Sequence, residues 1–160
     1  RENIPGYTGW ISLLSDKPFF ISQCDFCFMI GPDEYKEYVH ETLAKEAKHF
    51  ERVFYHLDGP GQIIHLDEIL KIEEIDGIQW INGAGSAPIY DPKWFDIYRK
   101  VISAGKLLQV YCYNIEELNH IDEIVQAVGS AKGMCFICRG KQHEKEKFVS
   151  ILNKYNVPIE

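Results

Sequence analysis

Four short apolar runs, rich in β-branched and aromatic residues, alternate with longer amphipathic segments along this chain. Runs of this kind predict β-strands, here over residues 53–58, 78–82, 107–113 and 134–139. Their first residues lie about 25 to 30 positions apart, which is the length of one strand-plus-helix unit. The pattern therefore predicts a structural repeat of a strand followed by a helix.

Helix signals punctuate the segments between these runs. The first helix begins at Pro32 and carries an apolar stripe to Phe50, the next runs from Asp91-Pro92 to Gly105, and a third from Asn114 to Gly129. Two shorter helices are predicted over about 62–71 and 144–155. Strands that alternate with such helices indicate one α/β domain over residues 1–160, with a parallel sheet and right-handed crossovers.

The first thirty residues break this pattern. Residues 7–14 and 19–30 look extended, and Asp16-Lys17-Pro18 is a turn between them. A hairpin and a single strand with a long loop are both compatible with this lead-in segment.

Polar side chains interrupt the apolar strands near their carboxyl ends, where parallel sheets bind ligands. Alternation along a strand places His56 and Asp58 on one face, opposite the apolar residues that would pack on helices. They are either hydrogen-bonded interior groups or an acid/base or metal-ligand pair. Gln79, Gln109 and Tyr111 lie on neighbouring predicted strands and are candidates for the same ligand site at the carboxyl ends of the strands. His65, in the first turn after the glycine loop, either faces the site or lies at the surface, and the surface position is the one expected.

Two cysteines lie in the last strand, three positions apart, and an extended strand sends such positions to opposite faces. Cys138, near the strand end, is a candidate thiolate ligand, and Cys135 is expected to be a small core residue. A flavodoxin-like doubly wound sheet gives the same order of elements. The polar positions on the second face favour a barrel instead, because a doubly wound sheet needs that face to be apolar.

Composition narrows the function classes. The net charge of −7 and a pI near 5.4 disfavour a nucleic-acid partner. No apolar run is long enough to span a bilayer, so no membrane association is expected. The five cysteines are odd in number and three lie in strand-like runs, which predicts reduced thiols in the cytoplasm.

Several spaced segments resemble the uroporphyrinogen decarboxylase-like superfamily. They are Gln23-Cys24-Asp25-Phe26, the helix after Pro32, Tyr55-His56-Leu57-Asp58-Gly59, Ile78-Gln79-Trp80 and Gly105-Lys106, in the order found in that superfamily. It contains the decarboxylase of haem synthesis and methyltransferases that move methyl groups between corrinoid proteins and thiols. Its fold is a (β/α)8 barrel of about twice this length. The resemblance implies that this chain is the C-terminal half, with four strands and their helices.

The resemblance also implies a site. In the thiol methyltransferases a zinc ion is held by His-x-Cys and a further Cys, which match His56, Asp58 in place of the middle Cys, and Cys138. Asp25 is placed with a family aspartate near the substrate, and Gln79, Gln109 and Tyr111 would line its pocket. A methyltransferase with zinc, a small-molecule substrate and a corrinoid (methylcobalamin) donor, carried on a corrinoid protein, is the leading hypothesis. A half-barrel leaves two strand edges exposed, which suggests a missing N-terminal half or a homodimer.

Two alternatives remain open. One is a decarboxylase that acts on uroporphyrinogen or a related carboxylated substrate, although the arginines and the catalytic aspartate of that reaction come mostly from N-terminal barrel segments. The other is a catalytically inert ligand-binding fragment, in which half of the active-site wall is missing.

Overall fold

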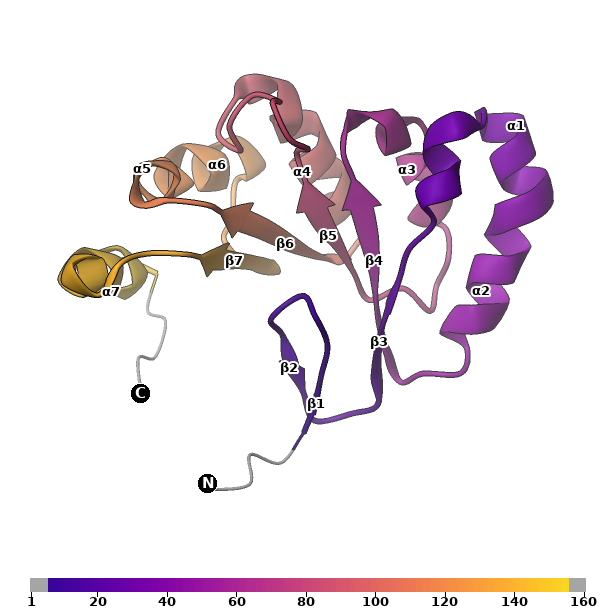
Figure 1. Cartoon of the computed structure of the whole chain (residues 1–160), viewed down its shortest axis with the longest axis horizontal. Helices are drawn as coiled ribbons and strands as arrows, with labels where there is room; N and C mark the ends of the chain where they lie inside the picture. Colours follow the sequence, from indigo (N-terminus) through magenta and orange to yellow (C-terminus); the bar gives the residue numbers. More distant parts are fainter. Residues whose placement is uncertain (1–5, 156–160) are drawn as a thin grey trace.

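The computed structural model describes residues 6–155 and is built around one five-stranded parallel sheet. Its strand order, β3-β4-β5-β6-β7, follows the sequence, so each strand pairs with its neighbour in the chain (Figure 1). The strands are β3 (Phe19–Ser22), β4 (Arg52–Asp58), β5 (Gly77–Ile81), β6 (Leu107–Cys112) and β7 (Met134–Cys138). The four predicted strands are confirmed to within one residue at each end. The fifth, β3, comes from the lead-in segment.

Helices connect successive strands. Between β3 and β4 lie η1 (Asp25–Met29) and a continuous helix made of α1 (Pro32–Glu34), a π-helical stretch η2 (Tyr35–His40) and α2 (Glu41–Ala47). The later connections contain η3 (Pro60–His65), α3 (Leu66–Ile69), η4 (Pro92–Trp94), α4 (Phe95–Ser103), α5 (Ile115–Asn119) and α6 (Ile121–Val128). The chain continues through η5 (Gln142–Glu144) into α7 (Lys145–Asn153). The helix predicted over 114–129 is therefore two helices that meet at His120.

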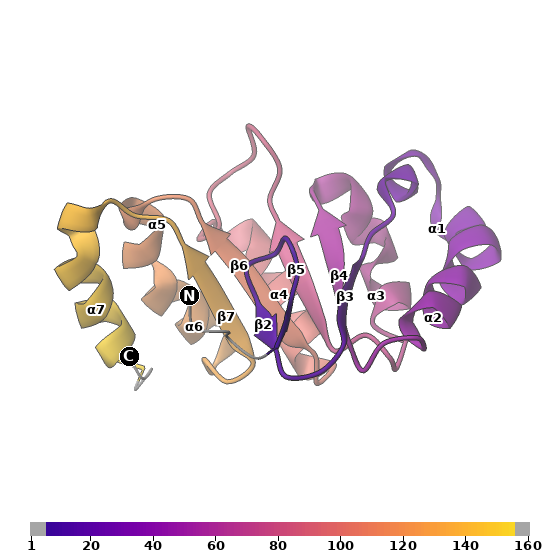
Figure 2. The ribbon, with the colours of Figure 1, turned by 60° about the horizontal axis from the view of Figure 1, so that its bottom comes forward.

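The described helices cover one face of the sheet, and the sheet curves away from them around a small N-terminal hairpin (Figures 1 and 2). This hairpin consists of β1 (Tyr7–Thr8) and β2 (Leu14–Ser15), paired antiparallel. A doubly wound sheet would carry helices on both faces. In residues 6–155 the second face is instead covered by the hairpin, so the flavodoxin-like alternative does not fit.

The lead-in segment thus resolves into a hairpin and a strand, and two details of the prediction are wrong. The hairpin turn lies at 9–13 rather than at 16–18, and Asp25–Met29 forms a 3-10 helix rather than an extended segment. Both depend on tertiary contacts. Ile11, at the hairpin tip, is fully buried against Ile21 and Phe54 on the inner face of the sheet.

The main core lies between the sheet and its helices. Every second residue of the strands points into it, including Tyr55 and Leu57 of β4 and Trp80 of β5, all fully buried. Trp80 packs against Trp94, with ring centroids 5.2 Å apart. Burial of such large side chains contributes about 1.5–3 kcal/mol each, so this layer dominates the stability of the fold.

His65 belongs to this layer, and its expected surface position is wrong. Its side chain is fully buried, lies stacked on Tyr35 at 4.7 Å between ring centroids, and its Nε2 lies 2.8 Å from the carbonyl oxygen of Cys27. His65 is the last residue of the 3-10 helix η3. Because a 3-10 helix has fewer residues per turn than the expected α-helix, the side chain of residue 65 lies on a different side of the helix, here the side that faces the core.

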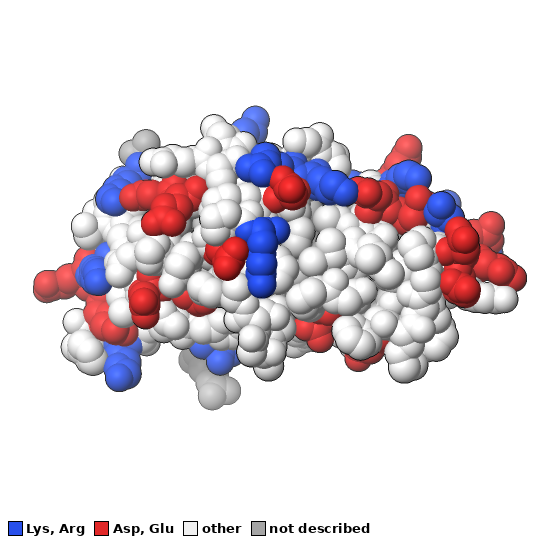
Figure 3. Space-filling model, turned by 90° about the horizontal axis from the view of Figure 1, so that it is seen from above, with Lys and Arg blue, Asp and Glu red and all other residues white. Residues whose placement is uncertain are grey.

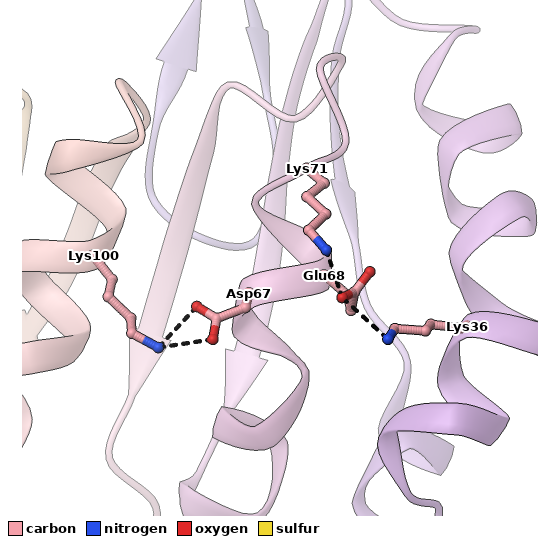
Figure 4. Close-up of polar contacts among 5 residues, drawn as sticks. All are labelled: Lys36, Asp67, Glu68, Lys71 and Lys100. Atoms are coloured by element: carbon pink, nitrogen blue, oxygen red, sulfur yellow. Dashed lines mark hydrogen bonds and ion pairs between the residues drawn. The ribbon is translucent and has the colours of Figure 1, made fainter.

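Ion pairs tie the outer helices together (Figure 4). Lys100 of α4 contacts both carboxylate oxygens of Asp67 in α3, at 2.8 and 2.9 Å. Glu68 lies between Lys71 at 2.7 Å and Lys36 at 3.5 Å. The hydrogen bond from Lys71 is the main reason that the pKa of Glu68 is below its ordinary value. These pairs are solvent-exposed, so they orient the helices and add little stability.

The surface carries both signs of charge. Seen from above, acidic and basic side chains are interspersed, without a continuous basic surface on that face (Figure 3). Among the residues that the structure describes, no helix has the length and apolar character that crossing a bilayer requires. The described cysteines are all free thiols.

Candidate functional site

The inner face of the sheet carries a row of polar residues that stand side by side on adjacent strands. The strand register pairs His56 of β4 with Gln79 of β5, and Gln79 with Gln109 of β6. Partners in a parallel ladder point to the same face. The two glutamines are almost fully buried, at 1% and 0% exposure, and His56 is half-buried.

These side chains are joined by hydrogen bonds that end on the hairpin. His56 Nδ1 lies 2.5 Å from Gln79 Oε1, Gln79 Nε2 donates to Gln109 Oε1 at 2.8 Å, and Gln109 Nε2 donates to the carbonyl oxygen of Ile11 at 2.7 Å. We call His56, Gln79, Gln109 and the Ile11 carbonyl the polar row. Buried amides are costly unless paired, and here both are paired on both sides.

His56 differs from the glutamines because one of its nitrogens is free. Among the described residues Nε2 has no hydrogen-bond partner, and it is not a buried atom. Trp10 of the hairpin lies edge-on to the imidazole, with ring centroids 4.8 Å apart. The polar row therefore presents one solvent-accessible imidazole nitrogen beside an aromatic wall.

A cavity of about 230 Å³ opens at the carboxyl end of the sheet. It is lined by one buried amide together with aromatic, aliphatic and basic side chains, namely Trp10, Gln79, Ile81, Tyr111, Tyr113 and Arg139. The guanidinium of Arg139 lies 5.7 Å from the centre of the Tyr111 ring, within the range of a cation–π interaction. Burial is the main cause that raises the pKa of Tyr113, and the negative charge of the nearby Glu117 is the second, so this phenol stays protonated.

The predicted substrate residues divide between two places. Gln79 and Tyr111 line the cavity, and the Tyr111 hydroxyl shares a hydrogen bond of 3.2 Å with Ser12 Oγ in the hairpin. Asp58 and Asp25 line a different cavity of about 580 Å³ together with Phe26, Phe28, Met29 and Gln62. Asp58 shares the inner face with His56, yet no hydrogen bond joins their side chains within residues 6–155. The structure thus forms two separate groups. Asp25 and Asp58 line one cavity, whereas Gln79 lines the other cavity with Tyr111 and is hydrogen-bonded to His56 and Gln109.

The expected meeting of His56, Asp58 and Cys138 is wrong. Cys138 is paired in register with Cys112 and packs into the helix-facing core, whereas His56 and Asp58 point to the inner face. Cys135 stands beside Gln109, so it is the cysteine of the inner face, and its expected place in the core is also wrong. Within residues 6–155 no three His, Cys, Asp or Glu side chains are grouped to hold a metal ion.

Cys138 has a distinct chemical environment on its own face. A hydrogen bond from Cys112 lowers the pKa of the Cys138 thiol, and the same bond together with burial raises the pKa of Cys112. Burial raises the pKa of Cys135. Because the thiolate is the reactive form, Cys138 is expected to react with iodoacetamide faster than the similarly half-buried Cys135. Peptide mass spectrometry after brief labelling measures this order.

Cys112→Ala is the matched variant for this measurement. Loss of the donated hydrogen bond should slow the alkylation of Cys138 and leave that of Cys135 unchanged. Labelling of Cys135 before Cys138 in the unsubstituted chain would contradict the assignment.

Sequence reasoning missed the contribution of the hairpin. The Ile11 carbonyl and Ser12 contact residues 98 and 99 positions later, and Trp10 contacts His56. No local pattern in the sequence indicates such contacts. Ser12 has a positive φ of 60°, an uncommon conformation for a residue other than glycine. Arg139 was within reach of sequence reasoning, because it directly follows β7 at the carboxyl end of the sheet.

Comparisons with known proteins add no relative to this description. No protein-family model matches the chain, and no curated protein and no solved structure match it.

Proposed function

We propose that this chain is the C-terminal half of a (β/α)8 barrel of the uroporphyrinogen decarboxylase-like type and acts as a cytoplasmic methyltransferase on a small thiol. The curved parallel sheet, with its described helices on one face, supports the half-barrel. The polar row is the observation that carries the function. It crosses β4, β5 and β6 within their length and leaves one imidazole nitrogen unpaired among the described residues. Gln79 of the row also lines the cavity at the carboxyl end of the sheet, where barrel enzymes act.

In this proposal His56 takes the proton of the thiol, and the resulting thiolate is the nucleophile that attacks the methyl carbon. A sulfur–carbon bond would form as the bond between that carbon and the donor breaks, and the donor would keep the electron pair of the broken bond. Gln79 and Gln109 orient the imidazole. The cavity of about 230 Å³ suits a small thiol but is too small for a corrinoid ring. His56 does not itself line this cavity, so the proposed thiol reaches the imidazole past Gln79 and Trp10, which line the cavity and contact His56. The methyl donor is therefore presented from outside, on a corrinoid protein.

Zinc does not fit the residues of this chain alone. Of the three expected ligands, His56 and Asp58 share the inner face, but Cys138 is on the other face. A tetrahedral site needs more than two protein ligands. A zinc site would therefore require ligands from outside the described residues, and the proposed proton transfer to His56 does not involve a metal.

The two edge strands, β3 and β7, leave unpaired backbone groups that need cover. We propose that an N-terminal half with further strand-and-helix units closes the barrel over them. A homodimer of this chain is the alternative, and sedimentation of the 160-residue chain alone separates a dimer from a monomer that awaits its other half.

Methyl transfer is tested with methylcobalamin as donor and 2-mercaptoethanesulfonate as acceptor. We expect demethylation of the donor and formation of the S-methyl product by a chain extended to the full barrel, with little activity from residues 1–160 alone. The methylated product is measured by mass spectrometry, and the donor by its absorbance. Absence of the product with both chains would remove the methyltransferase proposal and favour an inert ligand-binding fragment.

A carboxylated substrate is the second candidate, and Arg139 at the cavity is the observation that favours it. A guanidinium recognises carboxylates through paired hydrogen bonds. Tight binding of a porphyrinogen by the extended chain, lost on Arg139→Met, would support a decarboxylase. Binding that is unchanged by Arg139→Met would count against this role of the arginine.

A further inference from the structure

The direction of the hydrogen bonds in the polar row is fixed at one end. The carbonyl oxygen of Ile11 can only accept, so the side-chain group of Gln109 that faces it, at 2.7 Å, is the NH₂ donor. The other end of that amide, Oε1, then accepts from Gln79 Nε2 at 2.8 Å. Gln79 is left with its carbonyl oxygen toward His56 Nδ1, at 2.5 Å.

We infer that the polar row fixes the tautomer of His56. The oxygen of Gln79 accepts only, so neutral His56 carries its proton on Nδ1 and its lone pair on the accessible Nε2. Gln79 and Gln109 are positioning residues, since they act through the imidazole. The last acceptor of the row is the Ile11 carbonyl, which belongs to the hairpin and is 98 positions from Gln109 in the sequence. Packing of the hairpin on the sheet therefore sets the position of the proton on the imidazole.

Burial makes the reverse direction unfavourable. Gln79 and Gln109 are exposed by 1% and 0%, so bulk water has little access to a misdirected group. With both amides turned over, Gln109 Oε1 would face the Ile11 oxygen, and two acceptors would meet without a proton between them. Turning only Gln79 would place its Oε1 against Oε1 of Gln109, so two acceptors would again meet without a proton between them. One direction therefore satisfies every member.

The tautomer also limits the ligand, and this step rests on the proposed function. An Nε2 that carries a lone pair pairs with a donor, so the ligand group that meets it is a thiol or a hydroxyl rather than a bare carboxylate. Trp10, edge-on to the same ring, gives this contact an aromatic wall. The substrate class that fits is a small thiol or alcohol that loses its proton to His56.

Long-range ¹H–¹⁵N spectra of the ¹⁵N-labelled 160-residue chain at alkaline pH measure the tautomer directly. The His56 signals are assigned by their loss in His56→Asn. We expect the Nδ1–H pattern of couplings and nitrogen shifts in the unsubstituted chain. A predominant Nε2–H pattern would overturn the inference, whatever the activity of the protein.

Gln109→Met tests the transmission through the row, because Gln109 does not touch His56. Without its acceptor, the Gln79 amide is free to turn its NH₂ group to Nδ1, and the two nitrogen shifts of His56 should exchange toward the Nε2–H pattern. Gln79→Glu keeps an acceptor at Nδ1 and should retain the Nδ1–H pattern. A role in packing alone predicts the same tautomer in both variants.

Cys135→Ala is the matched control, since Cys135 stands beside Gln109 on the next strand but takes no part in the row. Its His56 signals should be unchanged. A folded Gln109→Met that keeps the Nδ1–H form would overturn the role of Gln109. If that variant does not fold, the tautomer of the unsubstituted chain still decides the inference. An Nδ1–H His56 in a protein without methyl transfer would leave this inference standing and remove only the proposed function.

Discussion

Replacing His56 by alanine is expected to lower kcat for thiol methylation by about 10²- to 10⁴-fold, the usual contribution of a positioned general base. The reason is that the thiol would keep its proton, and a neutral thiol is a poor nucleophile. KM should change little, because the base acts mainly in the transition state. Initial rates over a range of thiol concentrations, measured in a chain extended to the full barrel, separate the two parameters.

His49→Ala is the control for this experiment. His49 is an exposed residue after α2, outside the cavity and the polar row, so its removal should leave kcat unchanged. Adding the thiol already deprotonated, at high pH, should restore part of the rate of His56→Ala. Equal rates for the two alanine variants at neutral pH would show that His56 is not the base.

Replacing Trp80 by alanine is expected to lower the free energy of unfolding by about 3–5 kcal/mol. Trp80 is fully buried between the central strand β5 and the helices, against Trp94. The large cavity left behind cannot close, because the surrounding side chains belong to several different elements. Urea unfolding followed by circular dichroism measures the loss, provided that the slope with denaturant stays unchanged.

Trp10→Ala is the matched variant for stability. The Trp10 side chain is 56% exposed at the hairpin, so its loss should cost less than about 1 kcal/mol. Similar losses for the two tryptophans would contradict the placement of the main core on the helix side. Trp80→Phe should lie between them, because a smaller cavity remains.

The cysteines of β7 show where prediction from sequence reached its limit. Alternation correctly predicted that Cys135 and Cys138 point to opposite faces. Which of them points inward depends on the register with β6, and a shift of one residue reverses every side chain of a strand. The resemblance placed Cys138 inside, but pairing of Cys135 with Gln109 places Cys135 there.

Much of the local layout of this protein can be predicted from the amino-acid pattern. Its β-branched runs and its helix caps specify four of the five strands of the parallel sheet, most helices and the inner-face positions of His56, Gln79 and Gln109, because these depend on short-range periodicity. The position of the hairpin on the inner face, and the contact that the Ile11 carbonyl makes at the end of the polar row, depend on long-range packing that no local pattern predicts. That contact joins residues 98 positions apart. It exists because a buried amide needs an acceptor and the folded sheet leaves this one within reach.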